Sequence, residues 1–282
     1  MNLQEKIDKL DPVKIKLKEQ GFFTKKNLGQ NFIFDLNITD KIVRSSGHCD
    51  GRLIFEVGPG GGSLTRSILK AEPAKVFALE KDFRCIEILS ELEDISQGKL
   101  EVINQDALNF DYKKEIVNHS LPAKVIANLP YNISTELLFK WLDFAASFES
   151  LTLMFQKEVA ERICAQAGDK QYGRVSVIAS LLCERRILFE VSPTVFYPPP
   201  KVYSAVVHLE SKKDIAGYNL KKIRKVTKAA FGQRRKSIKN SLKEILNDSI
   251  EQKLLNIGIN PSERPENLSP QDFVKISEIL DG

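Results

Sequence analysis

Four glycines within five residues, in Gly58-Pro-Gly-Gly-Gly62, constrain the fold of this chain more than any other feature. They follow Leu53 to Val57, an apolar stretch that predicts a buried strand, and a helix-periodic segment begins directly after them. Glycine is needed where a backbone turns sharply or lies against a ligand. The first N–H groups of the following helix have no partner within that helix. The stretch therefore predicts a strand, a turn and a helix start that form one wall of a nucleotide-binding site.

The residues around this turn favour one class of cofactor over another. The dinucleotide fingerprint is G-x-G-x-x-G, but Ser63 stands where its third glycine would be. Glu56 instead precedes the turn and completes the pattern E-x-G-x-G-x-G. That pattern favours S-adenosylmethionine, which carries a cationic sulfonium and no phosphate. Glycine-rich turns are also common in α/β proteins that bind no cofactor, so the turn alone does not establish a cofactor site and further motifs are needed.

Two further predicted strands lead into acidic residues. Lys75 to Glu80 ends about twenty residues past the turn, where a carboxylate accepts the ribose hydroxyls in nucleotide-binding α/β folds. Leu100 to Asn104 is followed by Asp106, which either accepts the exocyclic amine of an adenine or acts as a cap or turn residue. Because the carboxyl ends of parallel strands meet at one edge of a sheet, we expect both acids to converge on the glycine turn.

Composition bounds the class of protein. With 282 residues, 42% hydrophobic and 28% charged, the chain can hold one large soluble domain and a small one. It has no apolar run as long as a membrane span and no secretory or transit signal, so we expect a cytoplasmic protein without membrane contact. The four cysteines lack C-x-x-C spacing and the three histidines are scattered, which predicts buried thiols in a reducing compartment and no metal site.

Positive charge is concentrated in one segment. The chain carries a net charge of +5, but residues 211–240 contain eleven Lys and Arg against one acid, Asp214. A run of charge is often only a solvated surface, yet this density next to Phe231 favours a polyanion such as nucleic acid. The residues predicted to contact RNA are Lys221, Lys222, Arg224, Lys225, Arg234, Arg235 and Lys236.

The fourth predicted strand, which begins at Lys124, runs into Asn128-Leu-Pro-Tyr131. This run resembles the (D/N)-P-P-Y motif of methyltransferases that act on an exocyclic amine, and its continuation to Thr135 resembles that of the ribosomal RNA adenine dimethyltransferases, the KsgA/Dim family. The resemblance extends over almost the whole chain. It is carried further by Leu28-Gly-Gln-Asn-Phe32, Glu56-Val-Gly-Pro-Gly60, Gln105-Asp-Ala107, Phe196-Tyr-Pro-Pro-Pro-Lys-Val202, Ser204-Ala-Val-Val207 and Phe231-Gly-Gln-Arg-Arg-Lys236.

The chemistry of methyl transfer accounts for the residue types in this motif. An adenine N6 is a weak nucleophile because its lone pair is delocalised into the ring, yet that lone pair must point at the methyl carbon. The Asn128 side-chain oxygen and a backbone carbonyl near Leu129 and Pro130 can accept the amine hydrogens and favour tetrahedral geometry at N6. Tyr131 would stack on the flipped base.

The resemblance implies further site residues. Family members place an aromatic residue of the proline-rich loop on the far face of the target base, and Phe196 stands at that position; a loop anchor packed on the core is the alternative. Ile33 replaces the leucine expected after Gln-Asn-Phe, a volume-neutral change that keeps a backbone contact to the cofactor. The cofactor-binding set is then Asn31, Ile33, Gly58, Gly60, Glu80, Asp106 and Asn128.

The order of the predicted elements indicates an α/β fold. We expect a Rossmann-like S-adenosylmethionine-dependent methyltransferase domain with a seven-stranded, mostly parallel sheet, followed by a small all-helical domain. The predicted parts are a charged, loosely ordered arm over residues 1–26, the methyltransferase domain over 27–211 and the helical RNA-binding domain over 212–282. Asn31 either caps a helix predicted from Leu36 to Ser45 or lines the cofactor pocket.

The resemblance also implies a function. It is dimethylation of N6 of two adjacent adenosines in the hairpin loop near the 3′ end of small-subunit (16S) rRNA during ribosome assembly, by a monomer that binds the small subunit. Two alternatives stay open: an enzyme of the antibiotic-resistance type that methylates an adenine in large-subunit RNA, and an assembly factor without catalysis. Glu80, Asp106 and Asn128 disfavour the assembly factor, because a protein that only binds RNA does not need all three.

Overall fold

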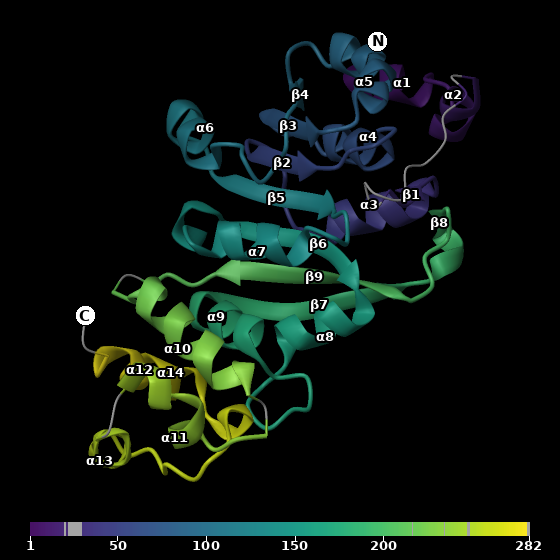
Figure 1. Cartoon of the computed structure of the whole chain (residues 1–282). Coiled ribbons are helices and arrows are strands. Elements are labelled where there is room, and N and C mark those ends of the chain that lie inside the picture. The colour runs from purple at the N-terminus through teal and green to yellow at the C-terminus, as the bar shows by residue number, and fades with distance from the viewer. Residues whose placement is uncertain (20, 22–29, 216, 234, 247–248, 281–282) are drawn as a thin grey trace. The chain divides into compact units, whose positions relative to one another are not determined.

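A computed structural model describes residues 1–19, 21, 30–215, 217–233, 235–246 and 249–280 of the chain (Figure 1). The chain divides into two compact units, one of Met1–Ala160 with Arg186–Glu210 and one of Glu161–Arg185 with Ser211–Gly282. Residues 161–185 thus group with the C-terminal helices, although the sequence placed them in the first domain. The domain limits at residues 26 and 211 remain predictions. No helix in the described ranges is long and apolar enough to cross a membrane.

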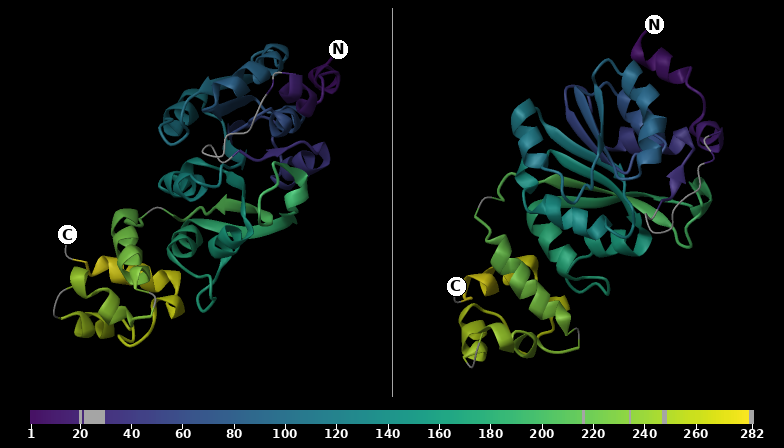
Figure 2. Two further views of the ribbon diagram at one scale, coloured as in Figure 1. Left: turned by 45° about the vertical axis from the view of Figure 1, so that its right-hand side comes forward. Right: turned by 45° about the horizontal axis from the view of Figure 1, so that its top comes forward.

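The strands of the main sheet run in the order β4-β3-β2-β5-β6-β9-β7. They are β2 (Leu53–Val57), β3 (Lys75–Glu80), β4 (Leu100–Asn104), β5 (Ala123–Asn128), β6 (Ser150–Gln156), β7 (Cys183–Val191) and β9 (Ser204–Ser211). The strands from β4 to β6 pair in parallel and β9 pairs antiparallel to β6, which confirms the predicted seven-stranded, mostly parallel sheet. Helices lie on both faces of this sheet (Figure 2), and every residue of β2 is accordingly buried.

The strand order fixes where a ligand can bind. In chain order, β3 and β4 are added on one side of β2, and β5 and β6 are then added on its other side. In open α/β sheets, ligands bind at the carboxyl ends of the strands where this reversal occurs, here beside β2 and β5. The connecting helices are α3 (Leu36–Ser45), α4 (Ser63–Lys70), α5 (Phe83–Ile95), α6 (Tyr112–His119), α7 (Ser134–Leu142) and α8 (Lys157–Cys164).

The described part of the N-terminal segment is folded, so the expectation of a loosely ordered arm was wrong for residues 1–19. It forms α1 (Leu3–Asp8) and α2 (Val13–Glu19). Val13 and Leu17 are one helical turn apart and both are buried, whereas the intervening Ile15 is 46% exposed. A Cβ atom placed on Gly61 would lie only 2.3 Å from Val13, so α2 packs directly against the glycine turn.

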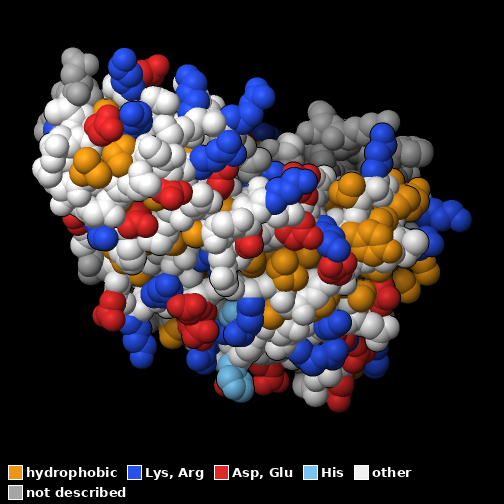
Figure 3. Space-filling model, turned by 90° about the horizontal axis from the view of Figure 1, so that it is seen from below, with side chains coloured by type: hydrophobic (Ala, Val, Ile, Leu, Met, Phe, Trp, Pro, Cys, Tyr) orange, Lys and Arg blue, Asp and Glu red, His pale blue; other side chains and the backbone are white. Residues whose placement is uncertain are grey.

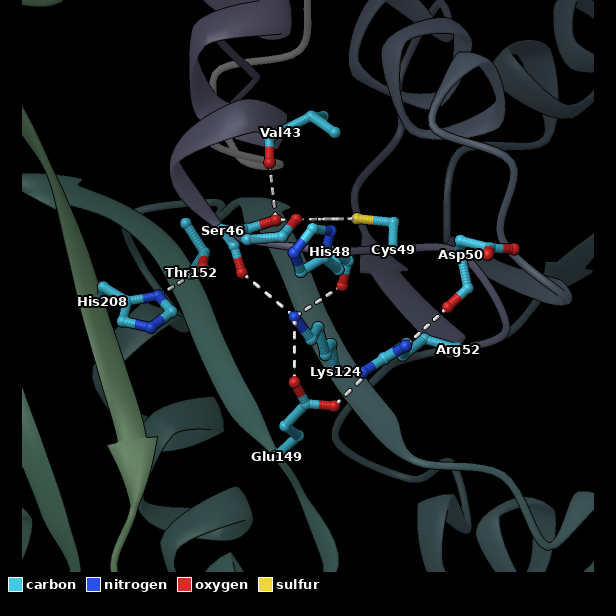
Figure 4. A network of polar contacts seen from close by, with 11 residues as sticks. Val43, Ser46, His48, Cys49, Asp50, Arg52, Lys124, Glu149, Thr152 and His208 are labelled. Atoms are coloured by element: carbon cyan, nitrogen blue, oxygen red, sulfur yellow. Dashed lines mark hydrogen bonds and ion pairs between the residues drawn. The ribbon is translucent and has the colours of Figure 1, made fainter.

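A buried lysine, Lys124, joins several segments through a network of polar contacts (Figure 4). It lies at the amino end of the sheet, opposite the ligand edge. The Lys124 side chain is 3% exposed, and its Nζ donates to the carbonyl oxygens of Ser46 (3.1 Å) and His48 (2.7 Å). It also lies 3.3 Å from Glu149 Oε1, and Oε2 of the same carboxylate accepts from Arg52 Nε. A buried ammonium group must be paired and hydrogen-bonded, and this network meets that requirement while it ties the α3–β2 connection to β5.

The second unit is helical. Helices α9 (Arg174–Leu182), α10 (Leu220–Gly232) and α14 (Pro270–Glu278) pack on one another around Phe231, whose ring lies 5.9 Å from Tyr172 and 5.5 Å from Phe273. The described part of this unit also contains the short helices α11 (Ile238–Ser241), α12 (Lys243–Leu246) and α13 (Ile250–Asn256). Phe231, which stands beside the basic run in the sequence, is partly buried and packs on aromatic residues of this unit.

Candidate active site

A cavity opens at the carboxyl ends of β2, β3, β4 and β5, at the edge that the strand order indicates. All of the residues predicted to bind the cofactor line it: Asn31, Ile33, Gly58, Gly60, Glu80, Asp106 and Asn128. The cap of α3 is Asp35, whose side chain accepts from the Asn37 N–H at 2.9 Å, so the interpretation of Asn31 as that cap was wrong. Lys81 and Ala107, which were not predicted to bind the cofactor, also line the cavity and adjoin the predicted acids.

The glycine turn has the backbone geometry that only glycine adopts readily. Gly60 has φ +56° and Gly62, which precedes the first residue of α4, has φ +88°. A Cβ atom on Gly60 would lie 2.4 Å from the Phe32 ring. The turn is therefore packed too closely on the Asn31–Ile33 segment to admit any side chain at that position.

Glu80 holds the turn as well as facing the cavity. Its Oε2 accepts from the Gly60 N–H at 3.1 Å, and its Oε1 accepts from the N–H groups of Lys81 and Asp82, both at 2.8 Å. Burial raises the pKa of this carboxyl, although the same three N–H groups act in the opposite direction. The sequence analysis predicted a ribose acceptor here and missed this structural role, since no local pattern indicates that Gly60 is the partner.

Asp106 is a turn residue that also lines the cavity, and its contact with an adenine amine remains a prediction. Its Oδ1 accepts from the Leu108 N–H at 3.0 Å, which makes it a turn residue, and the same side chain lines the cavity. Its Oδ2 accepts from Lys81 Nζ at 2.8 Å. This bond from Lys81 is the largest cause of a lowered pKa, so the Asp106 carboxylate is held in its charged form.

Glu56 is a buried carboxyl group without a full set of partners. It is 1% exposed, lines the cavity, and its Oε2 has no hydrogen-bond partner among the described residues. Burial raises its pKa to about 8. An unpaired buried oxygen at a cavity wall is unusual and points to a ligand that carries positive charge or a donor.

These features fit S-adenosylmethionine better than a dinucleotide. Three carboxyl groups border the cavity, Glu56, Glu80 and Asp106, and in their ionised form, which a bound cation favours, they would repel the phosphates of a dinucleotide. A cofactor with a cationic sulfonium and an ammonium group meets no such repulsion. Its neutral ribose and adenine can donate to the two carboxylates at the ends of β3 and β4.

We expect Glu56→Gln to remove a pH dependence of stability. Because the pKa of Glu56 is raised in the fold, its proton stabilises the folded state below the ordinary value of 4.5, and that contribution is lost as the pH rises toward 8. The variant, which cannot ionise, should gain on the wild-type protein by roughly 3 to 4 kcal/mol between pH 5 and pH 8. Urea unfolding of the cofactor-free protein at both pH values measures this difference. Glu87→Gln, an exposed change on α5, is the control, and an equal gap at both pH values would contradict the expectation.

The predicted catalytic motif ends β5 beside the glycine turn. Asn128 Nδ2 donates to the Asn31 carbonyl at 3.0 Å, which fixes the amide and leaves Oδ1 as the acceptor for a ligand. Leu129 and Pro130 line the cavity, and a Cβ on Gly58 would lie 3.4 Å from the Pro130 ring. Tyr131 does not line the cavity; its hydroxyl is 2.6 Å from Ser204 Oγ, and burial raises its pKa.

Phe196 lies in the core. Strand β8 (Phe196–Tyr197) pairs antiparallel with β1 (Phe32–Ile33), so that Ile33 faces Phe196. Phe196 is 4% exposed, and the next residue, Tyr197, is 57% exposed. This arrangement is that of the loop anchor which the sequence analysis held as the alternative, and contact of Phe196 with a target base remains a prediction.

The residues predicted to contact RNA differ in availability. Lys221 and Lys225 are exposed on α10, as are Arg235 and Lys236 after it, while Arg234 lies outside the described residues. Lys222 Nζ donates to the Leu280 carbonyl at 2.7 Å and Arg224 is half-buried, so both have structural contacts. Lys228 was not among the predicted residues; it is exposed and, seven residues after Lys221 and three after Lys225, lies on the same face of α10.

Comparison with known proteins identifies the family of the chain. The family model described as ribosomal RNA adenine dimethylase matches residues 21–282. The ribosomal RNA small subunit methyltransferase A of Agrobacterium fabrum strain C58 is 45% identical over 277 residues, which cover 97% of this chain and 99% of that protein.

Two solved structures also match this chain over most of its length. A dimethyladenosine transferase from Plasmodium falciparum matches with a TM-score of 0.75 and 26% identity, over 87% of this chain and 95% of its own. The 23S rRNA methyltransferase ErmE matches with a TM-score of 0.66 and 25% identity, over 89% and 100%. The chain therefore belongs to the ribosomal RNA adenine dimethylase family.

Proposed function

We propose that this protein transfers methyl groups from S-adenosylmethionine to N6 of two adjacent adenosines in the 3′-terminal hairpin loop of 16S rRNA, as a step in small-subunit biogenesis. The observation that carries the proposal is the cavity at the ends of β2 to β5, where the amide of Asn128 lies beside three carboxyl groups suited to this cofactor. The small-subunit target is supported by the name of the Agrobacterium relative. We further propose that the protein acts in the cytoplasm as a monomer.

The cofactor supplies an electrophilic methyl group on a cationic sulfur. The residues that would hold it are Glu80 at the ribose, Asp106 at the adenine amine and Asn31 with Ile33 along the facing wall. Glu56 would stabilise its positive charge, since a buried carboxylate next to a cation loses its raised pKa. The close contact between Gly60 and Phe32 keeps this wall rigid.

The target adenine would approach the same edge from the Asn128 side. The Asn128 Oδ1 and the carbonyl of Leu129 would accept the two hydrogens of N6, and this directs the nitrogen lone pair at the methyl carbon. The bond from Asn128 Nδ2 to the Asn31 carbonyl sets the orientation of that acceptor before substrate arrives. Tyr131 would contact the base through its ring, which the bond to Ser204 holds in place.

Nucleoside mass spectrometry tests the proposal. Unmethylated small subunits and large-subunit RNA are incubated separately with the protein and S-adenosylmethionine. We expect N6,N6-dimethyladenosine in the small-subunit RNA alone. Its appearance only in large-subunit RNA would favour an enzyme of the ErmE type, and binding of subunits without any methylation would favour an assembly factor.

The exposed lysines of α10, Lys221, Lys225 and Lys228, are proposed to contact RNA phosphates. On the face shown in Figure 3, Lys and Arg side chains are interspersed with Asp and Glu. A local row of lysines therefore indicates a contact with RNA phosphates better than the net charge of the protein does. Replacing the three by alanine should weaken subunit binding by about 30-fold near 0.15 M salt and lower the slope of log K against log salt by about 2 to 3. Filter binding across salt concentrations measures both. Lys275→Ala, on α14 beside Asp272, is the control, and an unchanged salt slope in the triple variant would refute the contact.

A further inference from the structure

The segment that carries Asp106 has little main-chain structure of its own. Residues 105–111 connect β4 to α6. The Gln105 N–H donates to the Glu80 carbonyl at 3.1 Å, and after it only short turns occur, such as the bond from the Asn109 N–H to the Asp106 carbonyl at 2.9 Å. Asp106 nevertheless needs a fixed position, because hydrogen bonds weaken steeply with distance and angle. Something outside the segment has to hold it.

Lys140, in the last turn of α7, makes that contact. Its Nζ donates to the carbonyl oxygens of Leu108 (2.5 Å) and Phe110 (2.8 Å), and lies 3.5 Å from that of Ala107. The ammonium group also lies 5.2 Å from the centre of the Tyr112 ring, whose hydroxyl donates to the Ala107 carbonyl. The segment thus wraps around a single cation.

These contacts act on Asp106 through the backbone. Three carbonyl dipoles that converge on one point repel one another unless a cation lies between them. Without it, residues 107–110 would relax and the Leu108 N–H would no longer fix Asp106 Oδ1. The other bond to Asp106 comes from Lys81, whose side chain is 64% exposed and is free of any such wrapping contact among the described residues. We therefore expect the orientation of the Asp106 carboxylate to depend on Lys140.

We propose that Lys140 is a positioning residue that sets the selectivity of the cofactor site for a 6-aminopurine. It holds residues 106–110 so that the Asp106 carboxylate faces the exocyclic amine of adenine and rejects a 6-oxopurine, whose oxygen would face the carboxylate as a second acceptor. The inference rests on the proposed function, which assigns Asp106 to the adenine amine. Lys140 itself does not line the cavity.

Calorimetric titration with two ligands tests this role. S-adenosylhomocysteine carries the 6-amino group, and S-inosylhomocysteine carries an oxygen in its place. The wild-type protein should prefer the adenosyl ligand by about 100-fold, since a site built to accept a hydrogen bond discriminates strongly against a ligand that cannot donate it. In Lys140→Met we expect binding of the adenosyl ligand to weaken about tenfold and that of the inosyl ligand less than about twofold. Lys140→Arg, which keeps the charge and several donors, should recover most of the preference.

Lys75→Met is the matched control. Lys75 Nζ also donates to a backbone carbonyl, that of Gly98 at 3.2 Å, and lies 5.4 Å from an aromatic ring, but at the amino end of β3. It should keep the wild-type ratio of affinities even if it loses some stability. Equal weakening of both ligands in Lys140→Met, or an unchanged ratio, would overturn the inference. If Asp106→Ala also kept the wild-type preference, the assignment of Asp106 would fail together with it, and if the wild-type protein bound neither ligand the proposed function itself would fail.

Discussion

Replacing Asn128 by alanine should lower kcat about 10³-fold while subunit binding stays within about threefold of wild type. The amide is the acceptor that directs the lone pair of N6, and this interaction is worth most in the transition state, when the nitrogen becomes tetrahedral. The bond from Asn128 Nδ2 to the Asn31 carbonyl also disappears, so we expect cofactor affinity to fall, but only about threefold. Single-turnover methylation of preformed complexes measures the chemical step without the binding steps.

Tyr131→Phe is the matched control for this experiment. It removes the hydroxyl that lies 2.6 Å from Ser204 Oγ but keeps the ring, so it disturbs the same motif without touching the amine acceptor. We expect a loss of kcat below about tenfold. Methyl transfer at a near-normal rate by Asn128→Ala would refute the amine-orienting role, whatever happens to the affinities.

The sequence predicted elements well where local patterns coincide. The helix Leu36–Ser45 and the strands Lys75–Glu80 and Leu100–Asn104 have the bounds that the sequence indicated. In each, an apolar run ends at polar residues that favour caps or turns. The convergence of Glu80 and Asp106 on one cavity followed from the topology of parallel strands, which is why it too could be predicted.

Contacts between distant parts of the chain could not be predicted in this way. Glu80 accepts a hydrogen bond from the Gly60 N–H, and Lys140 donates to the carbonyl groups of residues 107–110. Both contacts join segments more than about fifteen residues apart in the sequence. Phe196 illustrates the same limit: the sequence left open whether it contacts a target base or anchors its loop on the core, and pairing with Ile33 buries it. Helix α2 was missed because Val13, Ile15 and Leu17 alternate along the sequence, and tertiary packing buries only Val13 and Leu17.

Replacing Glu80 by alanine should weaken cofactor binding by at least about 100-fold. Two losses add. The ribose loses its carboxylate acceptor, and the N–H groups of Gly60, Lys81 and Asp82 lose theirs, so the turn that borders the cavity is no longer tied to β3. Titration calorimetry with S-adenosylhomocysteine measures the affinity, and thermal unfolding of the cofactor-free protein measures the second loss separately.

A pair of variants separates these two contributions. Glu80→Gln keeps one oxygen, but its amide N–H groups would face backbone donors, so we expect cofactor affinity to fall by about tenfold or more, together with a lower unfolding temperature. Glu101→Ala, on the neighbouring strand β4, removes a carboxylate that is 49% exposed and outside the cavity lining, and should change neither quantity. Near-normal affinity in Glu80→Ala would refute its assignment to the ribose. Lost affinity with an unchanged unfolding temperature would instead locate the whole effect at the ribose and show that the three backbone bonds contribute little to the fold.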